Sequence, residues 1–353
     1  MNKPSASYDS ERTIELDFVR ATEAAALNVF KWIGKGDKNR ADAAACDAIE
    51  GMFELIDACG TVSISEGAKD EAPHFGMGKK LGRWRPGTVR FDIAIDPIDG
   101  TTNLSNGLPN SISVLCAASP ERGIRQALKH VPSFYSKKIA YGPAVKHFMA
   151  RKGNAQIQID HPIEANLRIV ARALNKRVQD LTVVMLARDR HKSLMKGVRA
   201  TGAALRMIGD GDITAAIAPS MPDSGVDLYV GIGGSPEGVI AAAAIKCLGG
   251  DLQMKMWPKD GEELGDLKKH GHHAELDHIY KADDLADGKN IIFCATGITD
   301  SSLLPGMRFY NHSAITYSIL MRAKQSTVRY IKTIHNLESK TIRLSSDHDE
   351  HGI

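Results

Sequence analysis

Several features that would point to other classes of protein are missing from this sequence. No stretch approaches the roughly 18 uninterrupted apolar residues of a membrane-spanning helix, so we expect no membrane partner. The opening residues, Met1–Ser5, run into charged residues without the apolar segment of a secretory signal. We therefore expect no export by that route and favour a cytoplasmic protein. Internal repeats and low-complexity tracts are absent as well.

Cysteine is scarce and follows no pattern. The five cysteines are odd in number, scattered along the chain and never spaced as CxxC. This pattern indicates neither a disulfide framework nor a thiolate zinc site. We expect all five to be buried packing residues, namely Cys46, Cys59, Cys116, Cys247 and Cys294.

An excess of charge of one sign is also missing. The 45 Lys and Arg residues oppose 42 Asp and Glu residues, and the net charge of +3 is too weak for a concentrated nucleic-acid-binding surface. We expect no nucleic-acid partner. The 353 residues, 43% of them hydrophobic, are instead enough for a large core, and their number favours two domains or one large layered unit.

Helical and strand patterns alternate along most of the chain, which predicts a layered α/β fold. Helices are predicted at residues 13–33, 41–58, 164–176, 189–200, 212–218 and 236–248. Strands are predicted at residues 61–64, 89–95, 112–117, 138–141, 181–187, 225–231 and 290–295. The segment 142–162 is predicted to cross between two units, residues 1–160 and 161–353, with the last strands free to pack back on the first unit. The Gly-, Lys- and Arg-rich segment 67–87 is predicted to be a loop over a site.

The strongest chemical signal is the segment Asp96–Thr102, with the sequence DPIDGTT, which directly follows the predicted strand 89–95. Pro97 has no N–H to donate, so we expect it to stop the hydrogen-bonded ladder of that strand. Gly100 allows a turn. The segment is thus predicted to leave the strand with its polar groups clustered.

Three oxygen donors of this segment could converge on hard cations: the carboxylates of Asp96 and Asp99 and the Ile98 carbonyl. Oxygen-only ligation favours Mg²⁺ or Mn²⁺. Thr101 could orient a water molecule for attack, or it could cap a helix that begins there. The alternative for the whole segment is a strand followed by an ordinary Asx or capping turn.

Two further pairs of charged residues allow two interpretations each. Arg188 and Arg190 follow a predicted strand and could both face one phosphate, whose oxygens suit guanidinium groups, or they could belong to a solvated basic loop. Asp210 and Asp212 flank a glycine and could accept hydrogen bonds from sugar hydroxyl groups or cap the next helix.

Glu237 follows Gly231, Gly233 and Gly234 and lies at the start of the predicted helix 236–248. Glycine allows the backbone to approach a ligand closely, and a helix N-terminus favours anions. A dinucleotide-binding loop is the alternative. It is disfavoured because Pro and Glu interrupt the glycine pattern and no acidic ribose partner follows at the expected offset.

Together these segments resemble a known family. The string at 96–102 is similar to the signature of the lithium-sensitive, magnesium-dependent phosphomonoesterase superfamily, which includes inositol monophosphatases and fructose-1,6-bisphosphatases. From about residue 13 to 338, the chain resembles the class II fructose-1,6-bisphosphatases. This resemblance is carried, in the same order and at similar spacing, by residues 36–42, 65–73, 187–191, 209–212, 231–238 and 295–299. It implies a layered α-β-α-β-α sandwich of the sugar phosphatase type with two mixed-sheet units, the first binding metal and the second binding substrate.

The resemblance also implies roles for individual residues. Two or three Mg²⁺ or Mn²⁺ ions per site would be held by Asp42, Glu66, Asp96, the Ile98 carbonyl, Asp99 and Glu237. Substrate contacts are implied at Lys38, Gly100, Thr101, Tyr135, Arg188, Arg190, Asp210, Asp212 and Gly234. Thr101, polarised by a neighbouring carboxylate such as Asp42, would orient the attacking water. The chain departs from the family pattern at Asp99, where the family usually has the longer Glu.

The implied activity is hydrolysis of fructose 1,6-bisphosphate to fructose 6-phosphate and phosphate by metal-activated water, in gluconeogenesis or the Calvin cycle. A dimer or tetramer of identical chains is implied as well. Three alternatives stay open. The first is an enzyme that also hydrolyses sedoheptulose 1,7-bisphosphate. The second is an inositol-phosphate phosphatase, which would not need Arg188 and Arg190. The third is a regulator that binds a sugar phosphate without catalysis.

Overall fold

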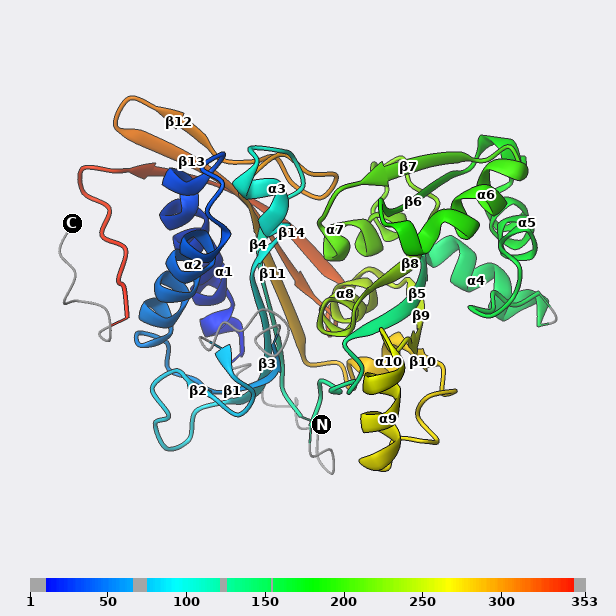
Figure 1. Ribbon diagram of the computed structural model, residues 1–353. Coiled ribbons are helices and arrows are strands. Elements are labelled where there is room, and N and C mark those ends of the chain that lie inside the picture. The colour runs from blue at the N-terminus through cyan, green and yellow to red at the C-terminus, as the bar shows by residue number, and fades with distance from the viewer. Residues whose placement is uncertain (1–10, 66–74, 121–125, 154, 346–353) are drawn as a thin grey trace, which may run out of the picture.

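Two mixed β-sheets organise the part of the chain that the computed structural model describes, residues 11–65, 75–120, 126–153 and 155–345 (Figure 1). The first sheet contains β1 (Cys59–Ser65), β2 (Lys80–Leu81), β3 (Arg90–Asp99), β4 (Ile112–Ala118), β11 (Ile291–Gly297), β12 (Arg308–Tyr310), β13 (Ser313–Arg322) and β14 (Thr327–Asn336). Its order is β12-β13-β11-β4-β3-β1-β2, with β14 paired to β13. Strands β1 and β3 are parallel, and the other pairs of this sheet are antiparallel.

The second sheet contains β5 (Tyr135–Tyr141), β6 (Thr182–Leu186), β7 (Ala204–Ile208), β8 (Leu228–Gly234), β9 (Asp251–Met256) and β10 (Tyr280–Lys281). Its order is β10-β9-β5-β8-β6-β7. Strand β6 is parallel to both β7 and β8, whereas β5 is antiparallel to β8 and β9. Both sheets are therefore mixed, as the family resemblance implies.

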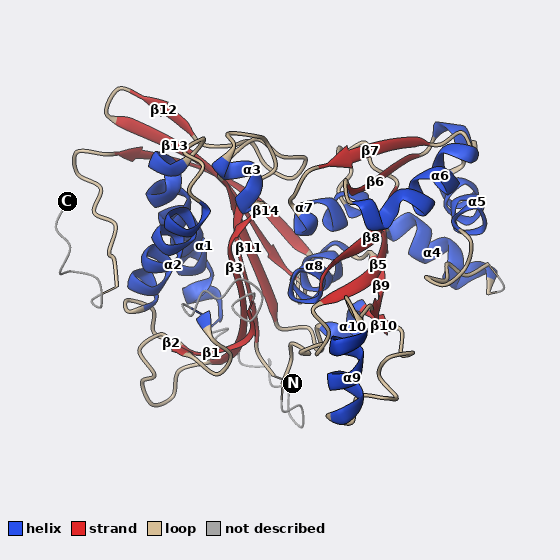
Figure 2. Ribbon diagram, in the orientation of Figure 1, coloured by secondary structure: helices blue, strands red, loops and turns tan. Residues whose placement is uncertain are grey.

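The helices form layers against these sheets (Figure 2). They are α1 (Glu11–Val29), α2 (Lys38–Phe53), α3 (Thr101–Ser105), α4 (Pro143–Lys152), α5 (Ile163–Leu174), α6 (Lys192–Ala200), α7 (Asp212–Ile217), α8 (Ser235–Leu248), α9 (Gly261–Lys269) and α10 (Ala282–Leu285). Short 3₁₀ helices are η1 (Phe30–Trp32), η4 (Val178–Asp180), η5 (Asp189–His191) and η6 (Ala218–Ser220).

Three apolar cores separate the layers. Helices α1 and α2 pack on one face of the first sheet, α7 and α8 lie between the two sheets, and α4, α5 and α6 lie beyond the second sheet (Figure 1). Helix α8 is buried on almost every side and carries four consecutive alanines, Ala241–Ala244, as expected for a helix with a sheet on either side. The predicted α-β-α-β-α layered sandwich is thus confirmed.

The structure confirms most of the predicted elements and adds others. Strands β12–β14 occupy a stretch for which the sequence predicts no element. Strand β12 has only three residues and β14 is largely exposed, whereas β13 is mostly buried and carries a strand signal that the prediction missed. The predicted crossing 142–162 contains α4, which begins at Pro143, a favoured residue for a first helical turn. The described part of the predicted loop 67–87 contains the short strand β2. The segment is therefore not entirely a loop.

The expected end of the strand at Pro97 is wrong. Strand β3 continues to Asp99, and its register with β4 shifts between Asp96 and Asp99. A bulge lets the strand skip the missing N–H of proline and then resume pairing. The carboxylates consequently extend from a strand rather than from a loop.

Each sheet takes strands from both sides of residue 160. Strand β5 belongs to the second sheet, and β11–β14 belong to the first. The division into units 1–160 and 161–353 stays a prediction. All five cysteines are buried and free, as expected. None of the helices in the described part of the chain combines the length and the apolar character needed to cross a bilayer.

Candidate active site

A cleft of about 580 Å³ opens where the α2 and β3–α3 segments face the second sheet. Fourteen of the fifteen sequence-predicted site residues line it: Lys38, Asp42, Asp96, Ile98, Asp99, Gly100, Thr101, Tyr135, Arg188, Arg190, Asp210, Asp212, Gly234 and Glu237. The remaining one, Glu66, lies outside the described residues. The structure thus brings together residues that are up to 199 positions apart in sequence.

The turn from β3 into α3 forms the floor of the cleft. Gly100 precedes α3 with a φ of 93°, a left-handed conformation that side-chain-bearing residues rarely adopt. A Cβ at this position would also overlap the Asn110 carbonyl. The Ser111 hydroxyl donates to the Gly100 carbonyl at 2.8 Å and holds the turn from the next strand. Glycine is therefore required here by both conformation and space.

Thr101 lies at the centre of this floor. Its Oγ1 has two acceptors within reach, the Ile98 carbonyl at 2.9 Å and Asp42 Oδ1 at 3.3 Å. The backbone N–H of Ile98 donates in turn to Asp96 Oδ1 at 3.1 Å. A hydroxyl has one proton to donate and lone pairs to accept with, so Thr101 can point its lone pairs into the cleft.

Asp99 is a carboxyl group of the site whose pKa is strongly perturbed. It is buried, and its nearest described hydrogen bond is a long one from the Thr214 N–H, at 3.4 Å. Burial raises the pKa of Asp99 well above its usual range, and the negative charges of Asp210, Asp212 and Glu237 raise it further. This concentration of anions favours the binding of cations.

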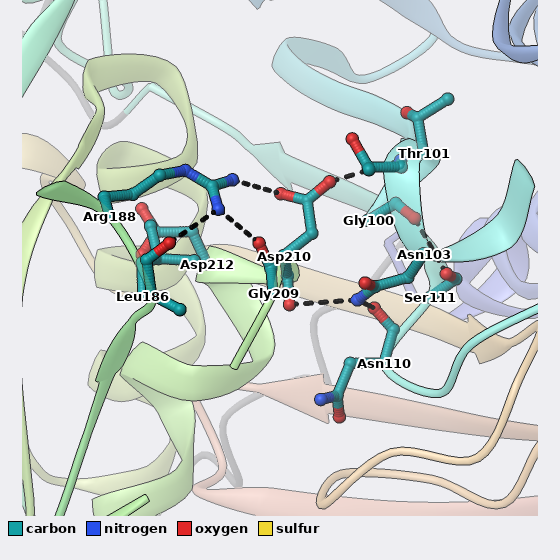
Figure 3. Close-up of polar contacts among 12 residues, drawn as sticks. Gly100, Thr101, Asn103, Asn110, Ser111, Leu186, Arg188, Gly209, Asp210 and Asp212 are labelled. Atoms are coloured by element: carbon teal, nitrogen blue, oxygen red, sulfur yellow. Dashed lines mark hydrogen bonds and ion pairs between the residues drawn. The ribbon is translucent and has the colours of Figure 1, made fainter. Parts of the chain in front are cut away.

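Arg188 and Asp210 connect the two sides of the cleft (Figure 3). Arg188 Nη2 lies 3.6 Å from Asp210 Oδ1, and Arg188 Nη1 donates to the Gly209 carbonyl at 2.6 Å. The other oxygen of Asp210 accepts from the Thr102 N–H at 3.2 Å, and Asn103 Nδ2 donates to the Asp210 carbonyl at 3.2 Å. Asp210 therefore joins the guanidinium of the second sheet to the first turn of α3.

Arg190 is held rigidly at the other end of this wall. Its Nε and Nη2 donate to the Ile232 carbonyl at 3.1 and 2.8 Å, and its guanidinium stacks on Tyr135 at 4.7 Å from the ring centre.

The neighbouring His191 is held by two hydrogen bonds. Its Nε2 accepts from the Ile232 N–H at 2.7 Å, and its Nδ1 pairs with the Leu186 carbonyl at 2.7 Å. This pattern requires a neutral imidazole with its proton on Nδ1. Burial lowers the pKa of His191, in agreement.

Glu237 is presented by the first turn of α8. Gly234 precedes this helix, and Pro236 lies in its first turn, where a missing N–H costs nothing. A Cβ on Gly234 would overlap the Glu237 carboxylate. The glycine therefore permits the carboxylate to fold back over the backbone beside the cleft.

The oxygen donors fit hard divalent cations by their chemistry. Asp42, Asp96, Asp99 and Glu237 line one cleft, and the carboxylates around Asp99 add to the effect of burial in raising its pKa. Among the described residues, no three His, Cys, Asp or Glu side chains are close enough together to hold a metal ion as they stand. Completing a metal site thus requires movement of these side chains or a ligand such as Glu66.

Sequence reasoning missed several residues of the site. Thr102 lines the cleft and accepts a hydrogen bond from Lys38 Nζ at 2.8 Å. Its position in the DPIDGTT string could have identified it as a site residue. Lys138 and Tyr229 lie beneath the wall and contact Asp212. The sequence offers one indication that this pair is special, a lysine in the predicted strand 138–141.

The fold and the cleft define a class: a layered α/β protein whose site has a carboxylate floor suited to hard cations and a guanidinium wall suited to phosphate. The sequence matches the family described as "Bacterial fructose-1,6-bisphosphatase, glpX-encoded" over residues 12–335. A relative from Haemophilus influenzae, a fructose-1,6-bisphosphatase class 2, is 39% identical over 93% of this chain and 97% of its own length.

A second relative, fructose-1,6-bisphosphatase 1 class 2 of Escherichia coli strain K12, is 38% identical over 93% of this chain and 97% of its own length. A relative of E. coli O6:H1 has the same values. The chain belongs to the glpX-encoded, class 2 fructose-1,6-bisphosphatase family. The predicted family is thereby confirmed.

Proposed function

We propose that this chain is a phosphoric monoester hydrolase that removes the 1-phosphate of fructose 1,6-bisphosphate, giving fructose 6-phosphate and phosphate. The observation that carries the proposal is the pairing of two opposite surfaces in one cleft. Carboxylates line the floor around Thr101, and Arg188 and Arg190 line the facing wall. A bisphosphate needs both, because one phosphate reacts while the other must be held by fixed positive charge.

The floor would hold the reacting phosphate. Two or three Mg²⁺ or Mn²⁺ ions, held by Asp42, Glu66, Asp96, Asp99, Glu237 and the Ile98 carbonyl, would neutralise phosphate oxygens and make water more acidic. Thr101 donates its single proton to Asp42 or to the Ile98 carbonyl, so its lone pairs are left to accept from a water molecule. This hydroxyl would orient the water toward phosphorus.

The wall would hold the second phosphate and the sugar. Arg190 is fixed by its hydrogen bonds to the Ile232 carbonyl and by stacking on Tyr135, and Arg188 is fixed by the Gly209 carbonyl. Guanidinium groups held in place lose little entropy when they bind phosphate. Lys38, Gly100, Gly234, Asp210 and Asp212 would complete the substrate contacts.

Phosphate release from fructose 1,6-bisphosphate tests this proposal directly. Turnover is expected with Mg²⁺ or Mn²⁺ and is expected to stop when a chelator removes the metal and to return when metal is restored. Sedoheptulose 1,7-bisphosphate and inositol 1-phosphate, assayed in parallel, decide between dual action, single action and the inositol alternative. Absence of turnover with every substrate and both metals would contradict an enzymatic function and leave the regulator.

A cytoplasmic setting and a dimer or tetramer of identical chains are part of the same proposal, and the assembly rests on the family resemblance. Light scattering of the purified protein measures the assembly. Cell fractionation locates the protein. A monomer, or a protein recovered outside the cytoplasm, would contradict these two points without affecting the proposed reaction.

A further inference from the structure

A buried lysine lies directly beneath the wall of the cleft. Lys138, on β5, is 1% exposed, and its Nζ donates to Asp212 Oδ2 and, at 2.8 Å, to the Gly234 carbonyl. Both acceptors belong to residues that line the cleft. An unpaired ammonium at this depth would cost several kcal/mol, so these two partners account for its burial.

Tyr229 holds the same carboxylate from a second direction. Its hydroxyl donates to Asp212 Oδ1, the oxygen that Lys138 does not contact, and the ring is fully buried. Burial raises the pKa of Tyr229 well above its usual range, and the nearby Asp212 raises it further, so the phenol stays a donor at neutral pH. Both carboxylate oxygens of Asp212 are therefore fixed from below.

The register of two strands places these donors on one face. Lys138 of β5 pairs with Gly231 of β8, and Ala140 pairs with Tyr229. Residues two apart on a strand point to the same side of a sheet, so Lys138 and Tyr229 both face the layer of α7 and α8. Asp212 is the first residue of α7 and meets them there.

Gly238 lets the first turn of α8, which carries Glu237, lie close to the side chains of Lys138 and Met254. A Cβ on Gly238 would lie 3.1 Å from Lys138 Cδ, so the lysine stem packs against the first turn of α8. A Cβ on Gly233 would overlap the Asp212 carboxylate. A displacement of the ammonium group would thus be transmitted to the Gly234 carbonyl and to Asp212.

We propose that Lys138 and Tyr229 are positioning residues that hold the Asp212 carboxylate and the Gly234 carbonyl in the arrangement that the sugar phosphate meets. The inference rests on the proposed function for the identity of that ligand. Neither residue lines the cleft, so both act through residues that do.

Substitution of Lys138 by Met tests the inference, because methionine has nearly the same length but no charge and no donor. At saturating metal, the KM for fructose 1,6-bisphosphate is expected to rise about 10- to 100-fold, the factor for a lost hydrogen bond to a charged group. The dissociation constant of fructose 6-phosphate, measured by calorimetry, should rise in parallel.

Lys137→Met is the matched control. Lys137 is the neighbouring residue on β5, points to the opposite face, and has a half-exposed side chain that lies 3.7 Å from Asp160. The same substitution there is expected to leave KM and product binding within about twofold, as is usual for surface pairs.

Tyr229→Phe keeps the test valid even if Lys138→Met fails to fold, since it removes only a hydroxyl group. Relative to wild type, the KM of Tyr229→Phe is expected to rise about 3- to 10-fold. In the Asp212→Asn background the same substitution should raise KM by less than about twofold, because the charge that accepts the hydrogen bond is then absent. The coupling between positions 229 and 212 separates positioning from general stability.

Two results would overturn the inference. If substitutions of Lys138 and Tyr229 lower the melting temperature and the maximal rate but leave KM and product affinity unchanged, the role of the pair is purely structural. A wild-type protein that neither hydrolyses fructose 1,6-bisphosphate nor binds fructose 6-phosphate would contradict the proposed function itself, and the inference with it.

Discussion

The two sides of the cleft are built in opposite ways. On the floor, Asp96, Ile98, Asp99, Gly100 and Thr101 come from one short run at the end of β3 and the start of α3. On the wall, the lining residues come from β5, from η5 with the residue before it, from the β7–α7 loop and from the β8–α8 junction. A short run gives a rigid arrangement for chemistry, whereas dispersed segments can be changed independently to suit a different substrate.

The electrostatics of the two sides differ as well. Floor carboxylates such as Asp96 and Asp99 are almost fully buried, and the pKa of Asp99 is raised. The wall cations are already satisfied, since Arg188 has Asp210 and Arg190 has the Ile232 carbonyl. The floor carboxylates thus lie in an environment that favours added cations, while the two wall arginines already have partners within the protein.

The largest effect is expected from the floor. Asp96→Asn keeps the acceptor for the Ile98 N–H but removes the charge that would anchor metal. The kcat/KM is expected to fall more than about 100-fold, since even groups that only support a metal ligand cost 10- to 100-fold when removed. Rates measured against metal concentration check this result. Asp277→Asn, at a side chain that is 93% exposed, is the control. An Asp96→Asn enzyme with normal metal dependence would exclude Asp96 as a ligand.

A large effect on rate alone is expected at Thr101. Thr101→Ala removes the hydroxyl that would orient water, so kcat should fall about 100-fold or more while KM changes little. Steady-state kinetics at saturating metal measure both constants. Thr101→Ser, which retains the hydroxyl, should recover most of the rate. If the Thr101→Ala enzyme has the same kcat as the wild-type enzyme, the hydroxyl only caps α3.

An intermediate effect, now on binding, is expected from the wall. Arg190→Ala removes a guanidinium that is fixed by Tyr135 and the Ile232 carbonyl. The KM for fructose 1,6-bisphosphate should rise about 10- to 100-fold, the loss expected for hydrogen bonds to a charged group. Hydrolysis of fructose 1-phosphate, which lacks the second phosphate, should be nearly unaffected. Equal losses on both substrates would show that Arg190 does not hold the distal phosphate.

The smallest effect is expected from His191, and only in acid. Its pKa is lowered in the folded protein, so below the unfolded value of about 6.5 the unfolded chain binds the extra proton. The contribution of neutral His191 to the free energy of unfolding is fully present above that pH and is lost as the pH falls toward the folded pKa. The free energy of unfolding falls by no more than about 1.4 kcal/mol per pH unit for one proton. Urea unfolding of wild type and His191→Gln between pH 7.5 and 5 measures the difference. An identical pH dependence in the two proteins would contradict a neutral, buried His191.

Local sequence patterns were sufficient for much of the fold. The apolar runs predicted as strands at 89–95 and 112–117 lie in the buried strands β3 and β4, and the helix predicted at 236–248 lies in the buried helix α8. Patterns were insufficient for β14, whose stability comes from ten-residue pairing with β13 rather than from its own apolar content. They were also insufficient at Pro97, where a bulge absorbed the residue that was expected to end the strand.

The sequence by itself determined the chemistry of the floor and the family. The DPIDGTT string brings its oxygen donors together within seven residues, so no distant contact is needed to recognise them. Only the tertiary structure decided how the wall is fixed. Lys138 contacts Asp212 and Gly234, Tyr229 contacts Asp212, and His191 contacts Ile232, and the two residues of each contact lie 17 to 96 positions apart in the sequence. The pairing of β5, β6 and β8 and the packing of α7 against them set those contacts. Hydrogen bonds between distant segments leave no periodic trace in a sequence.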